Sequence, residues 1–507
     1  MFLPQPCFSR YALIASIGVV LVLGLTVLVW LRHLASDIKI RKMGGVRAPI
    51  LAGNLLSASK LYFEIGKNQY DNRLVDWCTG QLDGLPSGRR TFAEFSLTGS
   101  KRVLITRDPE QIKAILATKF SHFGHGPMWH KLWRPFLGDG IFGVDGQLWH
   151  DSRSMIRPMF ARDRLRNLVI FDACTTKLLS KIPSAGATID LKDLFYRWAL
   201  DTTTEFLLGE NVNSLDFPVA PLIPKGEYYR AIRRIEEFIE PAIARTLAIP
   251  RARLAELSKS DTEYSFLHSI ARYTRDPKVI RDQIMSVLLA GRDTTAATLS
   301  WAMYELSNCP QIWAKLRREV LGKLGCQATP TYEILKDLTH VKNILNETLR
   351  LHPAAPLNMR QALETTTIPG RPGEADVVLL KGDSVTINTL GMHTCADLYP
   401  PISEEFADPK IFSPERWQHW TPKPWTYAPF SGGPRMCAGQ NFALTEMAFC
   451  CKLRKFDSAF ERIEYRGDWA AQKLQADIIG TPALGVPTAL YKLGEESDPV
   501  VSKFRGH

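Results

Sequence analysis

The chain has 507 residues, of which 45% are hydrophobic and 23% are charged, the balance of an ordinary globular protein. Its 63 basic and 52 acidic residues give a net charge of +11. The basic residues are dispersed, so this charge does not indicate nucleic-acid binding, and it suits an anionic membrane face or an acidic redox partner. The nine cysteines follow no framework spacing, and no C-x-x-C pair occurs. A disulfide scaffold and a paired-cysteine zinc or iron–sulfur site are therefore excluded, and a reduced, cytosol-facing domain is favoured.

Segment 1–31 is predicted to be a membrane anchor. From Tyr11 to Leu31 the chain is uncharged, strongly apolar and long enough to cross a bilayer. Arg10 precedes this run, and more basic residues follow it: Arg32, His33, Lys39, Arg41, Lys42 and Arg47. This positive excess predicts that the rest of the chain faces the cytosol. A cleaved secretory signal is the alternative, but the run is long, its charge bias is reversed, and no small-x-small cleavage site follows.

The chain beyond the anchor divides into three predicted parts. Residues 32–60 form a basic linker against the membrane surface, 61–490 the catalytic domain, and 491–507 a polar tail. Helical patterns dominate the first half of the catalytic domain. A β-hairpin is expected over 90–105, where polar and apolar residues alternate. The aromatic and glycine-rich segment 120–142 shows no periodicity and indicates a functional loop.

Helical spacing brings two pairs of side chains onto common faces. Trp149 and Arg153 are four residues apart, and Glu347 and Arg350 are three apart. A tryptophan packing on an arginine stem explains the first pair equally well. An E-x-x-R pair also arises by chance in a chain of this size, although this one lies in an amphipathic helix that Pro353 ends.

A long helix is predicted to begin after Asp276, a natural N-cap, with Pro277 at its first position. Two adjacent threonines lie inside it, where they are poor helix formers. A Thr294 hydroxyl that bonds back to the carbonyl of Ala290 bends the helix, and a bulge there leaves room for a small ligand. The alternative is a kink in a core helix with Asp293 exposed to solvent.

A glycine-rich loop carrying Cys437 precedes another helix. Gly432, Gly433 and Gly439 allow the sharp turns of this loop. The dipole at a helix N-terminus stabilises a thiolate, so Cys437 is expected to ionise easily and to act as a metal ligand or a nucleophile. Haem iron needs only one axial thiolate, so a haem-thiolate centre fits best. A buried cysteine in an ordinary corner is the alternative.

The sequence Phe430-x-x-Gly433-x-Arg435-x-Cys437-x-Gly439 resembles the haem-binding loop of the cytochromes P-450. This resemblance implies a mostly α fold with a small β-rich subdomain, behind an N-terminal transmembrane helix. It implies haem b as the cofactor and Cys437 as the axial ligand of the iron. It also implies that Arg435 pairs with a haem propionate and that Phe430 shields the sulfur.

Further motifs follow in the order found in the same family. The A-G-R-D-T segment resembles the family's oxygen-binding stretch, in which Asp293 and Thr294 relay protons. A P-E-R-W element implies that Arg416 completes a structural charge cluster with Glu347 and Arg350. By the same resemblance, four other residues lie near the haem propionates: Trp149, Arg153, Arg360 and His393.

Within the family, the motifs look most like the fungal microsomal group that hydroxylates alkanes and fatty acids at the chain end. This implies the endoplasmic reticulum membrane and electrons from NADPH through a separate NADPH–cytochrome P-450 reductase. The group usually has His-Arg where this chain has His393-Thr394, and the loop after Ile368 and segment 401–411 also diverge. Fungi deploy relatives in natural-product pathways. The small hydrophobic substrate is therefore either a fatty acid or alkane, or a polyketide- or terpenoid-like intermediate.

Four segments are expected to hold the substrate: the 120–142 loop, the helix around Thr294, Ala354 to Met359, and Ile478 to Leu484. Two other functions are open. One is a haem-thiolate isomerase or dehydratase that does not use O2, against which the Asp293–Thr294 pair argues. The other is a non-catalytic membrane haem-binding protein, against which the completeness of the motif set argues. No nucleic-acid partner is expected.

Overall fold

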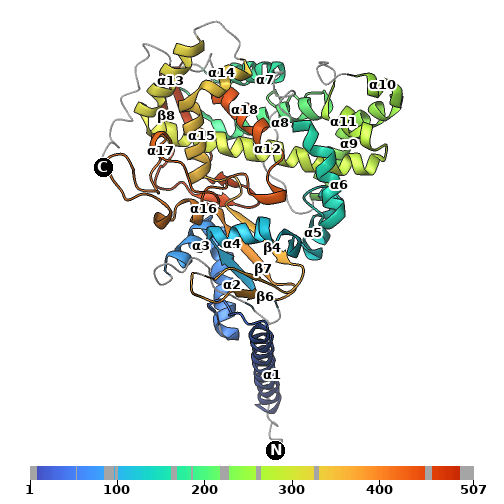
Figure 1. The fold of residues 1–507 in the computed structure, drawn as a ribbon, viewed down its shortest axis with the longest axis vertical. Helices are drawn as coiled ribbons and strands as arrows, with labels where there is room; N and C mark the ends of the chain where they lie inside the picture. Colours follow the sequence, from blue (N-terminus) through green and yellow to red (C-terminus); the bar gives the residue numbers. More distant parts are fainter. Residues whose placement is uncertain are drawn as a thin grey trace, which may run out of the picture. The chain divides into compact units, whose positions relative to one another are not determined.

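The computed structural model describes the main part of the chain: residues 8–52, 54–84, 96, 101–160, 168–183, 186–216, 228–257, 264–324, 331–370, 372–451 and 460–491. The fold is mostly α-helical with small β-sheets, as predicted (Figure 1). It divides into two compact units that cut across the predicted catalytic domain 61–490. The first unit comprises Met1–Gly124 and Asn358–Asn388, and the second comprises His125–Leu357 and Thr389–His507. The predicted polar tail lies outside the described residues, apart from Tyr491.

The first unit begins with α1, Phe8–Lys42, which carries the expected anchor. Its segment Ala15–Lys42 has a mean hydropathy of 2.1 and is almost wholly exposed, so by length and composition it could cross a membrane. The helix continues through residues predicted to belong to the linker and ends at Lys42, two residues before Gly44, whose φ of +71° suits glycine. The linker also overlaps the start of α2, Leu55–Tyr70.

The rest of the first unit is built around a four-stranded sheet in the order β1-β7-β4-β2. Strand β1 pairs in parallel with β7, from Val103 opposite Ser384 to Thr106 opposite Ile387. Most of the predicted hairpin over 90–105 lies outside the described residues. The strands of this sheet are β1 Val103–Thr106, β2 Phe123–Gly124, β4 Leu357–Ala362 and β7 Ser384–Asn388. The unit also contains α3 Leu74–Asp83, α4 Pro109–Lys113, β5 Thr366–Ile368 and β6 Val377–Leu379.

The second unit is a helical body with two small sheets, of order β3-β11-β8 and β10-β9. Its helices are α5 Pro127–Leu137, α6 Gly146–Ile156, α7 Val169–Ser180, α8 Leu191–Leu208, α9 Tyr228–Ala248, α10 Arg251–Glu256, α11 Phe266–Tyr273, α12 Pro277–Asn308, α13 Pro310–Leu324, α14 Tyr332–Asp337, α15 Thr339–Leu351, α16 Thr389–His393, α17 Arg416–His419 and α18 Gln440–Cys451. Its strands are β3 Thr188–Asp190, β8 Arg462–Tyr465, β9 Leu474–Ala476, β10 Gly480–Pro482 and β11 Pro487–Tyr491.

Helix α12 runs through the middle of this body and packs against α8, α9, α15 and α18 (Figure 1). Its N-terminus is the predicted one, because Asp276 accepts hydrogen bonds from the backbone N–H groups of Lys278 and Val279. The contact with α8 is close: a Cβ added at Gly291 would lie 3.0 Å from the side chain of Thr203. The sequence of α12 thus fixes both its start and its tight packing in the core.

The segment 120–142 differs from its prediction as a loop, because it contains helix α5. Pro127 occupies the first turn, where proline is tolerated. Pro135 lies inside the helix near its end, which Gly138 terminates with a φ of +55°. Two of the glycines that suggested a loop, Gly126 and Gly138, therefore cap the two ends of a short helix.

Candidate functional site

The loop before α18 holds Cys437 in a tightly folded turn. Ser431 and Gly433 both have positive φ values, of 62° and 65°. A Cβ on Gly432 would lie 2.4 Å from the ring of Trp425, so only glycine fits there without a shift. The backbone N–H of Cys437 donates to the carbonyl of Phe430 over 3.0 Å, which closes the loop.

Cys437 is accessible to solvent, although many protein atoms lie near its thiol. The Cys437 side chain is accessible, yet burial among neighbouring atoms raises the pKa of its thiol. The backbone N–H of Gly439 and the charge of Arg153 act in the opposite direction but do not outweigh burial. The prediction that this thiol ionises easily is therefore wrong for the protein alone, because desolvation exceeds the effect of the helix N-terminus.

Cationic and aromatic side chains surround the cysteine loop. Nη2 of Arg435 lies 2.6 Å from Oδ1 of Asp145, and its guanidinium stacks over Trp149 at 4.6 Å from the ring centroid. Trp149 and Arg153 lie on one helix, α6, as their spacing predicts. Burial lowers the pKa of Arg435, and the adjacent Asp145 carboxylate opposes that shift.

Asp145 is a residue of this site that sequence reasoning did not identify. Besides its ion pair with Arg435, its carboxylate accepts hydrogen bonds from the backbone N–H groups of His125 and Gly126, at 2.8 to 3.0 Å. It precedes α6 as the N-cap residue. The only sequence signal for Asp145 is its position just before the helix that carries Trp149. Its partner Arg435 lies 290 residues away, so no local pattern joins the two.

The middle of α12 is more accessible than the residues on either side of it. Residues 288–294 are half-exposed, whereas the helix is mostly buried on either side of them. The hydroxyl of Thr294 donates to the carbonyl of Ala290 over 2.7 Å, as predicted. Asp293 is largely buried, not exposed, and burial raises the pKa of its carboxyl, opposed by the charge of Arg292 at 3.4 Å. A hydroxyl and a carboxyl with an elevated pKa thus adjoin this accessible stretch.

A second buried carboxyl, on α18, contacts the same helix α12. Oε2 of Glu446, on α18, accepts a hydrogen bond from the hydroxyl of Thr295 over 3.1 Å. Burial raises the pKa of Glu446 to about 8. Within the described residues, its other oxygen, Oε1, is buried without a hydrogen-bond partner. Sequence reasoning did not identify this contact between α12 and α18.

The residues around Cys437 and those near the accessible stretch 288–294 of α12 fit a haem. The accessible thiol of Cys437 can serve as a single axial ligand, and the half-exposed stretch 288–294 belongs to a helix that packs on α18. Arg435, Arg153 and Trp149 supply cationic and indole N–H donors, which suit the carboxylates of the cofactor. The donor set matches the chemistry of a flat macrocycle with anionic side groups.

The predicted charge cluster is present. Arg350 pairs with both carboxylate oxygens of Glu347 at 2.8 Å, and Nε of Arg416 lies 2.9 Å from Oε1 of Glu347. All three side chains are at most 1% exposed. The indole N–H of Trp417 and the backbone N–H of Ser413 also donate to this carboxylate. The charge of Glu347 is thereby compensated from several sides, which a buried ion needs.

Backbone groups hold both ring nitrogens of His393, and its predicted place near a propionate stays a prediction. Its imidazole is fully buried, and both ring nitrogens bind backbone groups. Nε2 accepts from the N–H of Ala428 over 2.9 Å, and Nδ1 lies 3.1 Å from the carbonyl of Arg350. Burial, together with the charge of Arg350, lowers its pKa to about 3, so the ring is neutral. His393 thus links α15 to the segment before the cysteine loop.

Arg360 lies in the first unit, on strand β4. It is 5% exposed, and its Nη1 donates to Oδ1 of Asn358 over 2.6 Å and to the carbonyl of Met359 over 2.8 Å. These contacts are local to the strand. Its predicted contact with a propionate stays a prediction.

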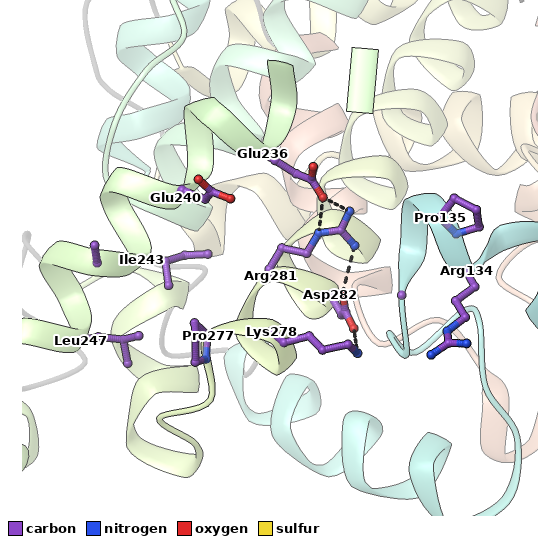
Figure 2. A pocket seen from close by; sticks show the side chains of 12 residues that line it. Arg134, Pro135, Glu236, Glu240, Ile243, Leu247, Pro277, Lys278, Arg281 and Asp282 are labelled. Carbon is purple, nitrogen blue, oxygen red and sulfur yellow. Dashed lines mark hydrogen bonds and ion pairs between the residues drawn. The ribbon is translucent and has the colours of Figure 1, made fainter. Parts of the chain in front are cut away.

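A pocket of about 580 Å³ lies elsewhere in the second unit, among α5, α9 and the start of α12. Figure 2 shows its wall of paired charges: Arg281 points toward Glu236 and Asp282, and Lys278 reaches the same Asp282. Its lining, taken from the described residues, includes Arg134, Pro135 and Gly138 of the predicted substrate-holding segment 120–142, and none of the predicted catalytic or cofactor-binding residues.

This helical body has the features of the haem-thiolate class of oxidoreductases. It presents an accessible thiol just before a helix, with cationic side chains beside it, and it carries a threonine–acid pair. A family model described as Cytochrome P450 matches residues 95–259 and 226–462. The chain belongs to the cytochrome P450 family, whose members are haem-dependent monooxygenases.

Three curated relatives extend over most of the chain. Cytochrome P450 monooxygenase pvhE of Talaromyces variabilis is 39% identical, covering 91% of this chain and 93% of its own length. Cytochrome P450 52A3-B of Candida maltosa is 34% identical over 80% of this chain and 84% of its own length. Cytochrome P450 52A12 of Debaryomyces hansenii is 34% identical over 82% of this chain and 87% of its own length. The similarity thus covers nearly the whole architecture.

Proposed function

We propose that this monooxygenase is held by α1 in the endoplasmic reticulum membrane. It inserts one oxygen atom from O2 into a small hydrophobic substrate, with electrons from NADPH delivered by a separate reductase. One observation carries the proposal: the accessible thiol of Cys437 and the half-exposed stretch of α12 with Asp293 and Thr294 lie in the same compact unit. These are the two parts that such a reaction requires, a metal ligand and a route for protons.

Haem, when bound, supplies the activation of dioxygen. Cys437 would ligate its iron, and the N–H of Gly439, which donates to the sulfur, would stabilise the thiolate. Arg435 holds a propionate, because its planar guanidinium donates two parallel hydrogen bonds to a carboxylate. Trp149, Arg153 and Arg360 are further propionate contacts. Phe430 and Gly433 shape the loop that carries the sulfur, since the carbonyl of Phe430 accepts from the N–H of Cys437 and Gly433 has a positive φ.

Asp293 and Thr294 handle protons. Burial raises the pKa of Asp293, which favours the protonated form that a proton donor needs. The Thr294 hydroxyl, now donating to Ala290, can turn toward the accessible side of α12 when it donates elsewhere. Glu347, Arg350 and Arg416 do not take part in the chemistry. They hold α15 and α17 in place near the cysteine loop.

The substrate class has two candidates. Resemblance to the fungal alkane and fatty-acid group supports a long-chain fatty acid or alkane hydroxylated at its end. Divergence from that group at His393-Thr394 supports a larger natural-product intermediate. Both are apolar, as are Leu357, Ile478 and Leu484 of the predicted substrate-holding segments.

The test reconstitutes the full chain with a fungal NADPH–cytochrome P450 reductase in nanodiscs under isotopically labelled dioxygen. Fatty acids, alkanes and polyketide- or terpenoid-like scaffolds are screened for a shift of the Soret band and for labelled product. Labelled product that requires NADPH supports the proposal. Fatty acids that give neither shift nor product count against the first substrate class. Turnover without NADPH and O2 identifies an isomerase or dehydratase and overturns the proposal.

A further inference from the structure

Two glycines bring the segment that follows α5 directly onto helix α12. A Cβ on Gly138 would overlap the carboxylate of Asp282. A Cβ on Gly140 would overlap the hydroxyl of Ser286, one turn further along α12. The side chain of Asp282 is 3% exposed, and its Oδ2 accepts a hydrogen bond from the backbone N–H of Asp139 over 2.8 Å. The chain therefore lies on α12 around a buried carboxylate, and glycine allows this close approach.

One exposed amine joins this segment, residues 138–142, to the helix. Nζ of Lys278 lies 2.7 Å from Oδ2 of Asp139 and 2.9 Å from Oδ2 of Asp282. The Lys278 side chain is 58% exposed, and Figure 2 shows it reaching Asp282. His130 of α5 contacts the other oxygen of Asp139 at 3.0 Å. The hydrogen bond from Lys278 lowers the pKa of Asp139 below its ordinary value, so Asp139 is charged and attracts the amine.

The buried carboxylate of Asp282 does not depend on Lys278 alone. Nη1 of Arg281 lies 2.9 Å from Oδ1 of Asp282, and it donates to the carbonyl of Phe136 over 2.9 Å. Nη2 of the same guanidinium lies 2.5 Å from Oε1 of Glu236 on α9. Loss of Arg281 would leave Asp282 buried with little compensation, which is costly. Loss of Lys278 leaves Asp282 with its guanidinium partner and a backbone N–H, so the fold should tolerate it.

The two ends of this stretch of chain are held by contacts of different kinds. At the far end, Asp145 pairs with Arg435 at 2.6 Å, and the Arg435 side chain is 7% exposed. The carbonyl of Val144 accepts from the same guanidinium over 3.3 Å. At the near end, the pair of Lys278 with Asp139 joins two exposed side chains, and exposed pairs contribute little to stability. The near end therefore separates from α12 more readily than the far end leaves Arg435.

Segment 138–142 lies close to the part of α12 assigned to protons. Gly140 adjoins Ser286, and one further turn of the helix leads to Ala290. The carbonyl of Ala290 accepts the hydrogen bond from Thr294. The segment ends in Ile141 and Phe142, apolar residues of the region predicted to hold substrate. A movement of this segment therefore changes the space beside the accessible stretch of α12.

We propose that Lys278 is a positioning residue that holds segment 138–142 on α12, and that its release admits bulkier apolar substrates. Lys278, Asp139 and Asp282 together form a latch. The pocket of about 580 Å³, with Gly138 in its lining, lies against this latch and gives the segment space to move. The closed latch favours a slender chain, and the released latch favours a molecule with rings. The inference rests on the proposed function, because it concerns which of the two candidate substrate classes enters.

The experiment uses the full chain with haem in nanodiscs and first measures amide hydrogen exchange. Lys278→Met should speed exchange in peptides that cover segment 138–142, because the N–H of Asp139 is then held less firmly on Asp282. Lys278→Arg keeps the charge and should restore protection. Lys315→Met is the matched control, because Lys315 forms an ion pair of the same length, 2.7 Å, with Glu415 in another part of the unit.

The second readout is the entry of two probe ligands of different size. Imidazole is compact and clotrimazole is bulky, and both shift the Soret band when they bind haem iron. Lys278→Met should speed the association of clotrimazole by up to about fivefold, the population shift that loss of one exposed ion pair allows, and should leave imidazole unchanged. Asp139→Asn should have the same effect, and the double variant should add nothing, since both changes remove one contact.

Faster exchange and faster clotrimazole entry in Lys278→Met, both reversed in Lys278→Arg, support the proposal. Exchange equal to that of the wild type means that Lys278 does not hold the segment, and it overturns the proposal. Faster exchange with unchanged clotrimazole association overturns the role in substrate size. The same changes in Lys315→Met indicate general loosening and also overturn it. If neither azole shifts the Soret band of the wild type, the proposed function fails and the substrate role fails with it, while the exchange comparison still decides whether Lys278 holds the segment.

Discussion

The hydroxyl of Thr295 lies 3.1 Å from Oε2 of Glu446, and this hydrogen bond joins the middle of α12 to α18, the helix that follows Cys437. The two residues are 151 positions apart in the chain. Thr295 adjoins Thr294, and Glu446 is fully buried. The elements assigned to protons and to the metal ligand are therefore coupled through one buried carboxyl.

Replacing this carboxyl with an amide changes the pH dependence of stability. Burial holds the pKa of Glu446 at about 8, whereas in the unfolded chain it returns to about 4.3. Between these values the folded state keeps a proton that the unfolded state releases, so this group makes stability fall as pH rises, by roughly 1.4 kcal/mol per pH unit. Glu446→Gln removes that contribution, and urea midpoints from pH 5 to 8 measure it.

The matched control is Glu415→Gln, which alters a half-exposed carboxylate paired with Lys315 at 2.7 Å. The pKa of Glu415 is lowered, through its hydrogen bond to Lys315 against the opposing effect of burial, so it stays charged across this range. The stability of Glu415→Gln should therefore change with pH in parallel with that of the wild type. If the urea midpoints of Glu446→Gln and the wild type also change in parallel with pH, the prediction is contradicted. Glu446 is then ionised at neutral pH in the folded protein.

Removal of one member of the charge cluster should be costly. Arg416→Ala leaves Glu347 buried with one guanidinium fewer, which costs about 3–5 kcal/mol of unfolding free energy. Lys315→Ala removes an ion pair of similar length that is half-exposed, and it should cost less than about 1 kcal/mol. Chemical denaturation of both variants compares them. Equal losses mean that the cluster contributes no more than a surface pair.

Thr294→Ala should retain haem and release more peroxide per NADPH consumed. Loss of the hydroxyl removes a proton donor from the accessible side of α12, so product formation falls by roughly 10²-fold. Thr298→Ala is the control, since its hydroxyl makes the same backward contact one turn later, donating to the carbonyl of Thr294 over 2.9 Å. Haem content, product and peroxide are measured together. An unchanged product-to-peroxide ratio in Thr294→Ala removes this residue from the proton relay.

Features governed by neighbours in sequence could be predicted. The cap at Asp276, the backward hydrogen bond of Thr294 and the Glu347–Arg350 pair all join residues within four positions, and helix geometry alone specifies them. Family motifs added Arg416, which lies 69 positions from Glu347. The placement of Cys437 just before a helix also followed from local glycines.

Features that depend on packing could not be predicted. The ion pair of Asp145 with Arg435 and the two backbone bonds of His393 join distant segments, and no local pattern marks them. The pKa of Cys437 was predicted in the wrong direction, because a helix N-terminus is visible in sequence and desolvation is not. Helix α5 was predicted as a loop because segment 120–142 is rich in glycine and shows no apolar periodicity, although Gly126 and Gly138 cap a helix there.

The most direct measurement of the central claim is the visible spectrum of the full chain in membranes, reduced and exposed to carbon monoxide, for the wild type and Cys437→Ala. Thiolate ligation by Cys437 predicts a strongly red-shifted Soret band in the wild type that is absent from the variant. Circular dichroism of both proteins verifies that they are folded. A folded wild type without this band, or a variant that keeps it, would contradict the assignment of Cys437 as the ligand of haem iron.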